Sequence, residues 1–305
     1  MSASSEAGSG TRRPSQFDTL ESIPVDVPES ATSAASSFVV RVLPAADPTA
    51  PVLLMLPAMA VKAKFYLPMI KALQGLGLSG ATVDLRAQGE STPTLDTAGN
   101  FGYREMLEAD LPAIVAAVRG RFPGAPVFLF GHSLGGVLSL LYSAGTPDGV
   151  AGVVTIGTGS VYWRAFAAER RVKVLLGAQY VSIVSRARGH WPAGSKVMGG
   201  PMAGRVMVDW ARHSRTGHYR PSGSTRDYDR LLRELVLPVL MISMDSDPLG
   251  PRSTIDHLGA KLVSAKLTRL HLDEASGVVN RDHFAWVKDA PVVGGLVSGW
   301  VRENA

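Results

Sequence analysis

The stretch Val127-Phe-Leu-Phe-Gly131-His-Ser133-Leu-Gly135-Gly136 decides how this sequence folds. Its first four residues are apolar, as in a strand that is covered on both faces. A G-x-S-x-G pattern follows at once, and the apolar segment Leu134–Ala144 is predicted to be a helix. A serine on a sharp turn between a buried strand and a helix projects its hydroxyl above the sheet, and glycines beside it let the two elements approach. This context predicts a nucleophilic Ser133 rather than an ordinary glycine-rich turn.

Short apolar runs of the same character lie on both sides of this stretch. Strand–helix alternation over about 250 residues predicts an α/β fold with a mainly parallel central sheet and helices on both faces. The predicted strands are Phe38–Leu43, Val52–Leu56, Ala81–Val83, Val127–Phe130, Val153–Ile156, Val239–Ser243 and Leu267–Leu272. The predicted helices are Tyr103–Arg119, Leu134–Ala144 and a segment from about His283 to Val301.

Composition excludes several classes of protein. The chain has 305 residues, of which 46% are apolar and 19% charged, a mix typical of a globular cytoplasmic protein. It has no cysteine, which excludes disulfide scaffolds, thiolate zinc sites and a cysteine nucleophile. We find no apolar run long enough to span a membrane, no secretory signal, and no Walker, H-E-x-x-H or dinucleotide-binding motif. The sequence therefore implies neither a cofactor nor a metal.

The chain divides into three predicted regions. Residues 1–30 are rich in small polar residues and are predicted to be a disordered leader. Residues 31–157 and 236–305 hold the strands and form the predicted core. Residues 158–235 contain helical fragments and no clear strand, and are too long for a loop. We therefore predict that residues 158–235 form a helical cap over the edge of the sheet.

The cap is the basic part of the chain. It holds 14 Lys and Arg against 5 Asp and Glu, whereas the remainder holds 17 against 21. No nucleic-acid recognition motif accompanies this charge, so we expect no nucleic-acid partner. Two interpretations stay open: a solvated arginine-rich face, or a set of cations that attracts an anionic substrate. The candidate cations are Arg164, Arg170, Arg171, Arg186, Arg188, Arg205, Arg212 and Arg215, and the cap residues Trp163, Trp191, Trp210, Met202 and Met207 are candidates for an apolar pocket wall or for cap core.

A serine nucleophile needs a base, because an unassisted hydroxyl reacts poorly at neutral pH. His283 lies about ten residues after the last predicted strand, in a loop that faces the same rim of the sheet as Ser133. His132 is expected to pack beside the serine, and His271 to be buried within its strand. The other histidines are His190, His213 and His218 in the cap and His257 on a helix. His283 is therefore the predicted base.

The base needs a carboxylate to fix its tautomer and stabilise its charged form. Two candidates, Asp245 and Asp247, follow the strand Val239–Ser243, and Asp273 and Asp282 are weaker alternatives. The spacing alone leaves the choice between Asp245 and Asp247 open. The N–H of Leu134, directly after the serine, is placed to stabilise a developing oxyanion.

At this point the sequence resembles the α/β-hydrolase family, of the serine-hydrolase type with esterase, lipase and aminopeptidase-like relatives. The resemblance spans roughly residues 35–303. It rests on Val52-Leu-Leu-Met-Leu-Pro-Ala-Met59, Asp84-Leu-Arg-Ala-Gln-Gly-Glu-Ser91, the Ser133 turn, Leu237-Pro-Val-Leu…Asp247-Pro and Asp282-His283. It implies Asp247 rather than Asp245 as the acid, and Met59 as the second oxyanion donor. The chain departs from its relatives in two loops: Pro57-Ala58 stands where they often have His-Gly, and Ala60 and Ala87 stand where they often have glycine.

The resemblance implies a serine hydrolase that cleaves a carboxylic ester or thioester of a small molecule through an acyl-enzyme on Ser133. An acyltransferase or cyclase would use the same three residues. A non-catalytic ligand-binding protein is the alternative from a different class, since a fold does not fix a function.

Overall fold

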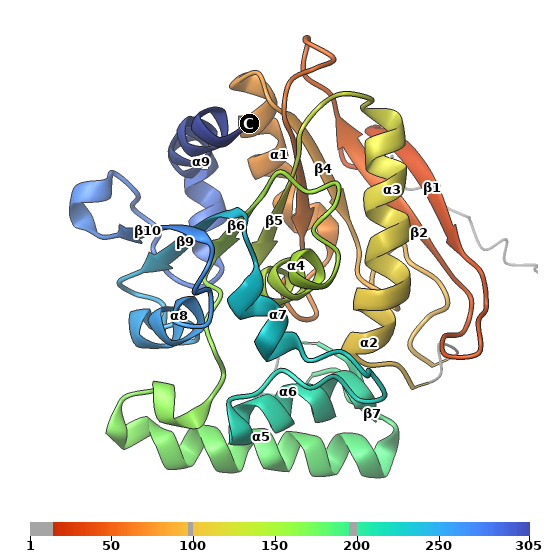
Figure 1. Cartoon of the computed structure of the whole chain (residues 1–305), viewed down its shortest axis with the longest axis vertical. Coiled ribbons are helices and arrows are strands. Elements are labelled where there is room, and N and C mark those ends of the chain that lie inside the picture. Colours follow the sequence, from red (N-terminus) through yellow and green to blue (C-terminus); the bar gives the residue numbers. More distant parts are fainter. Residues whose placement is uncertain (1–14, 97–99, 195–199) are drawn as a thin grey trace, which may run out of the picture.

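The computed structural model describes residues 15–96, 100–194 and 200–305, and a single eight-stranded sheet forms its centre (Figure 1). The strand order is β1-β2-β4-β3-β5-β6-β9-β10. From β4 to β10 neighbouring strands are parallel, whereas β2 is antiparallel to both β1 and β4. The strands are β1 (Glu21–Val27), β2 (Ser36–Leu43), β3 (Val52–Leu56), β4 (Ser79–Val83), β5 (Val127–His132), β6 (Gly152–Ile156), β9 (Pro238–Met244) and β10 (Lys266–Leu272).

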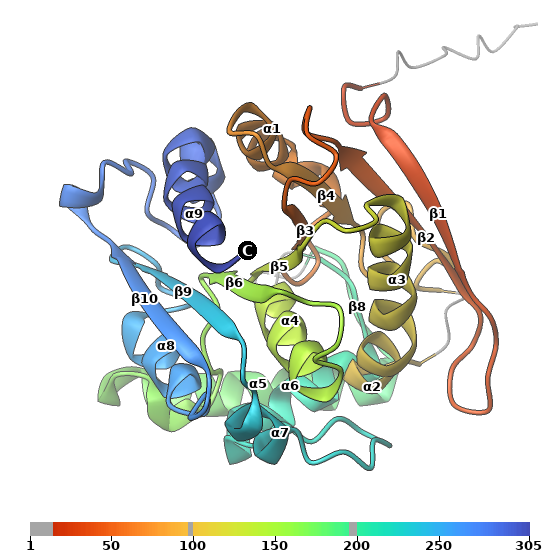
Figure 2. The same ribbon diagram turned by 45° about the horizontal axis from the view of Figure 1, so that its top comes forward.

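The central strands are apolar throughout because helices cover both faces of the sheet (Figure 2). Side chains alternate between the faces. In β3, Leu53 and Met55 pack in one apolar cluster with helices α1 and α9, while Leu54 and Leu56 pack in a second cluster with α3, α4 and α8. These helices are α1 (Leu67–Gly75), α3 (Leu111–Arg121), α4 (Leu134–Gly145), α8 (Arg252–Gly259) and α9 (Ala290–Asn304). The predicted α/β architecture is confirmed.

The seven predicted strands are all present, each extended by at most two residues at either end. The predicted helix over Tyr103–Arg119 is interrupted. It consists of α2 (Tyr103–Glu105), a π-helical turn η2 (Met106–Asp110) and then α3. Pro112 lies at the start of α3, and because it has no N–H it cannot continue a regular helical ladder.

The prediction of a disordered leader over residues 1–30 is wrong for its second half. Residues 1–14 lie outside the described residues, but Glu21–Val27 forms β1 and pairs with β2. Val25 and Val27 are buried while Asp26 between them is exposed, so the strand covers one edge of the core. Pro24 is tolerated because β1 is an edge strand, where a missing N–H costs little. The small polar residues around this short strand obscured its alternation.

Residues 158–235 connect β6 to β9 and are mainly helical. They contain η3 (Trp163–Ala165), α5 (Ala168–Arg188), α6 (Gly204–Thr216), α7 (Tyr228–Glu234) and the short pair β7 (His190–Trp191) and β8 (Met202–Ala203). Helices α5 and α6 pack side by side, with α5 outermost at the lower edge of Figure 1. The Gln88 side chain, in the loop after β4, donates to the Pro201 carbonyl at 3.2 Å. The segment therefore lies over loops at the carboxyl ends of the strands, while α7 packs against α4.

Candidate active site

Ser133 occupies a strained turn between β5 and α4. Its backbone has φ +52° and ψ −114°, a region that residues other than glycine rarely adopt. The Ser133 N–H donates to the Ile156 carbonyl of β6 at 3.1 Å, which ties the turn to the neighbouring strand. The side chain is half-buried, and in the described part of the chain its hydroxyl makes no hydrogen bond. The serine is thus accessible at the carboxyl end of the sheet.

The glycines around Ser133 permit close contacts that no other residue would allow. A Cβ placed on Gly131 would lie 2.3 Å from the Gly136 Cα, and one on Gly135 would lie 2.0 Å from the Leu56 carbonyl oxygen. A Cβ on Gly136 would lie 2.1 Å from the Thr158 hydroxyl. Helix α4 therefore begins directly against the ends of β3 and β6.

His283 and Asp247 form a buried pair beside this turn. The His283 Nδ1 lies 2.8 Å from the Asp247 Oδ2, and the Asp247 side chain is fully buried. The other oxygen, Oδ1, accepts the N–H groups of Leu249 and Gly250, both at 2.8 Å. With both oxygens engaged, the carboxylate is fixed in position and orients the imidazole ring.

The other carboxylates have different partners. Asp245 is exposed and accepts a hydrogen bond from the Arg281 Nε at 2.9 Å and one from the Ser246 hydroxyl at 2.8 Å. The Arg281 hydrogen bond lowers the pKa of Asp245 below its usual range. Asp273 and Asp282 accept backbone N–H groups of the turns that follow them. Of the four candidates, the structure brings Asp247 to His283.

The turn that carries Ser133 and the buried pair of His283 and Asp247 lie on either side of Gly157. This glycine directly follows β6. A Cβ on Gly157 would lie 3.1 Å from the Asp247 Oδ2 and 3.2 Å from the His283 Nδ1. The preceding residue, Ile156, accepts the Ser133 N–H. Within the described residues, no hydrogen bond joins the Ser133 hydroxyl to His283. In enzymes without bound substrate, hydrogen bonds between catalytic groups are often long and shorten only in the complex.

The backbone N–H groups predicted as oxyanion donors belong to Leu134 and Met59. Leu134 is the first residue of α4, so its N–H has no partner within the helix. The Met59 N–H makes no hydrogen bond within the described residues. Gly135 lies against the Leu56 carbonyl, close to the loop that carries Met59. The two predicted donors therefore lie on adjoining segments.

Comparisons with known proteins agree with this arrangement. The family model described as serine aminopeptidase, S33, matches residues 47–195. The chain belongs to the α/β-hydrolase family. No curated protein sequence matches the chain significantly.

Solved structures of α/β hydrolases share the fold at low sequence identity. DcsB in complex with its substrate analogue is 17% identical, with a TM-score of 0.62 over 93% of this chain and 99% of that one. A monoacylglycerol lipase from Paleococcus ferrophilus is 16% identical, with a TM-score of 0.61 over 88% and 99%. The thioesterase domain from the curacin biosynthetic pathway is 15% identical, with a TM-score of 0.56 over 91% and 99%. These likenesses establish the fold of this α/β hydrolase.

Sequence reasoning missed Tyr66, which links the parts of the α/β-hydrolase site. Its hydroxyl accepts the Ala58 N–H at 2.8 Å and lies 2.8 Å from the Nδ1 of His132. The His132 ring lies 4.8 Å from that of His283. Burial, followed by the charge of His283, lowers the pKa of His132 well below its usual value, so this imidazole is neutral. A buried tyrosine near a helix usually signals core packing, so the sequence carried no specific signal for this role.

His132 packs as predicted, but the prediction for His271 is wrong. His132 is completely buried, whereas His271 is half-buried. His271 lies on β10, at the edge of the sheet, where a strand has a neighbour on one side only. Its Nδ1 lies 2.8 Å from the Ser243 hydroxyl of β9.

Both alanines at customary glycine positions adopt a left-handed backbone. Ala60 has φ +59° and Ala87 has φ +61°. A Cβ on Gly200 of the insertion would lie 2.7 Å from that of Ala60, so the loop after β3 touches the insertion. Both loops therefore place an alanine in a conformation that favours glycine, at the cost of backbone strain.

Several arginines of the insertion have structural partners. Arg205 forms an ion pair with Glu105 at 3.3 Å, and Arg212 forms one with Asp209 at 3.4 Å. The Arg205 pair joins α6 to α2, whereas the Arg212 pair lies within α6. The apolar candidates Trp191, Met202 and Met207 are buried in the cluster that includes Leu134, whereas Trp163 and Trp210 are half-buried.

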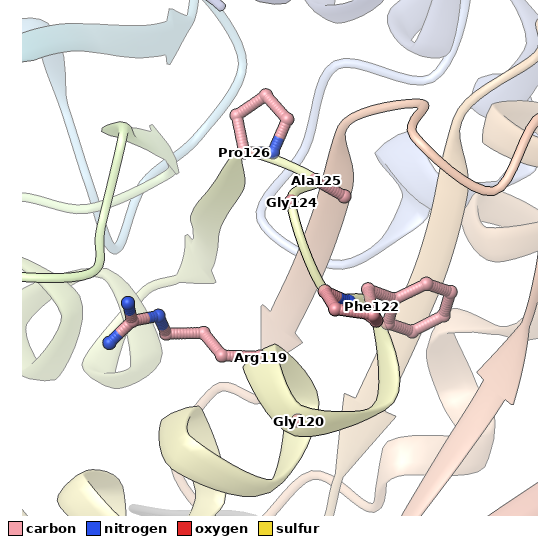
Figure 3. A pocket seen from close by; sticks show the side chains of 7 residues that line it. Arg119, Gly120, Phe122, Gly124, Ala125 and Pro126 are labelled. Atoms are coloured by element: carbon pink, nitrogen blue, oxygen red, sulfur yellow. The ribbon is translucent and has the colours of Figure 1, made fainter.

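A surface hollow elsewhere on the hydrolase lacks the chemistry of this site. It is lined by Arg119, Gly120, Phe122, Gly124, Ala125 and Pro126 among others (Figure 3). These residues precede β5, at the opposite end of that strand from Ser133. Arg119 is the one ionisable residue that lines it, so we do not assign the reaction there.

Proposed function

We propose that this α/β hydrolase cleaves carboxylic esters or thioesters of small molecules through an acyl-enzyme on Ser133. The observation that carries the proposal is the buried pair of His283 and Asp247 beside a serine held at positive φ. A serine, a histidine and a carboxylate in this relation are the parts needed for nucleophilic acyl transfer. They come from the ends of β5 and β9 and from the loop after β10.

In the first half of the reaction, the Ser133 oxygen attacks the carbonyl carbon of the substrate. The His283 Nε2 takes the hydroxyl proton, and the Asp247 carboxylate, on Nδ1, stabilises the resulting imidazolium. The N–H groups of Leu134 and Met59 donate to the oxygen on which negative charge develops. His283 then protonates the leaving alcohol or thiol as the carbon–oxygen or carbon–sulfur bond breaks, which leaves the acyl group on Ser133.

In the second half, His283 removes a proton from a water molecule, and the water oxygen attacks the acyl-enzyme. The same two N–H groups stabilise the second oxyanion. Its collapse breaks the bond to Ser133, which takes back the proton from His283, and releases the carboxylic acid. Tyr66 supports both halves indirectly, because its hydroxyl holds the loop that carries Met59.

The test is hydrolysis of short p-nitrophenyl esters by the wild type, by Ser133→Ala and by Ser246→Ala. Ser246 is an exposed serine next to Asp247, so it controls for a substitution near the site. We expect kcat to fall by roughly a factor of a million for Ser133→Ala and to stay within twofold for Ser246→Ala. A fluorophosphonate probe should label Ser133 in the wild type and in Ser246→Ala. A Ser133→Ala variant that kept the wild-type rate would refute the proposal.

The same experiment separates the alternative functions. A non-catalytic ligand-binding protein would leave the fluorophosphonate probe unreacted. An acyltransferase would form a new ester or amide when an alcohol or amine is added, whereas a hydrolase releases mainly the free acid. Product analysis over a panel of esters, thioesters and amides therefore identifies both the acyl donor and the acyl acceptor.

A further inference from the structure

Helix α5 carries an exposed apolar stripe that the fold leaves uncovered. Val172, Leu176, Tyr180 and Ile183 are 62%, 63%, 57% and 65% exposed. Their spacing of four, four and three residues places them on one side of the helix. Isolated exposed apolar side chains are ordinary, but a continuous row of four is not.

The opposite side of α5 is the one that packs on the rest of the protein. Ala178, Val181 and Ser185 are buried, and α5 packs along α6. Figure 1 shows α5 along the lower edge of the molecule. The stripe therefore points away from the core, and at its Tyr180 the ring meets that of Trp191 edge to face, with 6.2 Å between the centroids.

Basic residues lie at both ends of α5, on either side of the stripe. The α5 sequence holds five basic residues and one acidic residue, and residues 174–185 between them carry no charge. Arg171 and Lys173 are exposed near the start, and Arg186 and Arg188 are exposed near the end. Lys173, Arg186 and Arg188 form no ion pair with any described residue. Unlike Arg205 and Arg212, these cations have no internal role.

We propose that α5 lies on the surface of an anionic lipid bilayer, with the stripe among the acyl chains and the basic residues at the headgroups. An amphipathic helix with apolar residues on one side and Lys or Arg beside them binds such surfaces. A second copy of this chain is a poorer occupant, because two such helices meeting in either direction would bring positive charges together. None of the helices in the described residues has the combined length and hydrophobicity to cross a bilayer, so α5 lies along the surface.

The start of α5 contacts the loop that follows β9, which carries Asp247. Arg170, near the start of α5, donates to the Pro248 carbonyl at 2.7 Å. The next residue, Leu249, is 55% exposed and its N–H is held by Asp247. A bilayer beneath α5 would therefore adjoin the loop that carries Asp247, and would supply apolar esters to that rim of the molecule.

Because the chain has no cysteine, a single environment-sensitive label can be placed at will. We would label Leu176→Cys with the fluorophore NBD, and label Val263→Cys as the matched control. Val263 is 70% exposed but precedes β10, at the other end of the strands from the insertion. Both proteins are mixed with vesicles of phosphatidylglycerol and, separately, of phosphatidylcholine.

We expect NBD emission at position 176 to rise and shift to the blue on phosphatidylglycerol, with no change at position 263. In the unlabelled protein, Lys173→Gln with Arg186→Gln should weaken partitioning about 25-fold, at about fivefold for each cation. Leu176→Gln with Ile183→Gln should weaken it at least about tenfold. Raising salt from about 0.1 M to about 1 M should release the protein, because the Debye length falls from about 10 Å to about 3 Å. Hydrolysis of a water-soluble ester should be unchanged in both double variants, which separates this test from that of the reaction.

Three results would overturn the proposal. If the protein does not bind phosphatidylglycerol vesicles, the stripe is not a lipid-binding surface, and a protein partner is the remaining occupant. An equal response at positions 176 and 263 would indicate nonspecific adsorption. A blue shift at position 176 without lipid, together with a doubled mass in light scattering, would show that a second copy covers the stripe.

Discussion

Replacing Asp247 with Asn removes the charge that stabilises His283 and leaves the rest of its contacts in place. The asparagine Oδ1 can still accept the N–H groups of Leu249 and Gly250, which donate to the carboxylate at 2.8 Å. The Nδ2 group then faces the His283 Nδ1, at the position where the carboxylate Oδ2 lies 2.8 Å away. Because Nδ2 is a donor, Nδ1 must become the acceptor, and the imidazole proton moves to Nε2.

A histidine with its proton on Nε2 cannot accept the proton of Ser133, and its charged form has lost the adjacent carboxylate. We therefore expect kcat for p-nitrophenyl butyrate to fall about 10⁴-fold, the loss seen when other Ser–His–Asp enzymes lose this charge. That factor corresponds to about 5.4 kcal/mol of activation free energy, at about 1.36 kcal/mol for each power of ten. KM should change little, because the substitution does not alter the surface on which the ester binds.

Asp245→Asn is the matched control, two residues away on the same loop. Asp245 is exposed and engaged by Arg281 and Ser246, so its substitution should change kcat less than twofold. Circular dichroism and thermal unfolding would verify that both variants are folded. An Asp247→Asn protein within tenfold of the wild-type kcat, or an Asp245→Asn protein that loses as much, would refute the assignment of the acid.

Further predictions concern residues that hold the site and the core. Tyr66→Phe should lower kcat roughly tenfold with little change in KM, measured on the same ester, because a loop N–H beside the oxyanion donors loses its acceptor; an unchanged kcat would contradict this. Ala87→Gly should raise the free energy of unfolding by about 1 kcal/mol in urea titration, since it removes a left-handed alanine, while Ala116→Gly, at an exposed position in α3, should lower it by about 1 kcal/mol. Equal signs for these two variants would count against backbone strain at position 87. In the wild type the buried Arg86 guanidinium donates two hydrogen bonds to the Asp110 carboxylate. Asp110→Asn should lower the unfolding free energy by about 3–5 kcal/mol, because it leaves that guanidinium without a counter-charge. A loss below about 1 kcal/mol would mean that water reaches that guanidinium.

The sequence alone determined the alternating architecture and the position of the serine. Strands covered on both faces read as continuous apolar runs, so Val52–Leu56 is predicted at the bounds it has in the structure. The turn around Ser133 is equally local, because the glycines that allow it lie within three residues of the serine. Edge elements gave weaker signals. The strand Glu21–Val27 has one buried face and a proline, and its two buried valines were too few to distinguish it from a leader.

Only the tertiary structure decided which distant groups meet. Asp245 and Asp247 follow the same strand two residues apart, and no local pattern states which one faces a histidine 36 residues later. The backbone after β9 turns so that the Leu249 and Gly250 N–H groups hold Asp247 inward, which leaves Asp245 to Arg281. The link from Tyr66 to His132 likewise joins residues 66 positions apart.

The exposed face of α5 is a further feature that the sequence alone does not determine. Apolar residues at helical spacing predict a face that packs in the core, and Val172, Leu176 and Ile183 fit that pattern in sequence. In the structure the helix packs through Ala178 and Val181 instead, because α6 lies on that side. A sequence specifies which side chains avoid water, through their chemistry. Which of these side chains become buried depends on the elements that the fold packs against them, and that packing is a property of the whole chain.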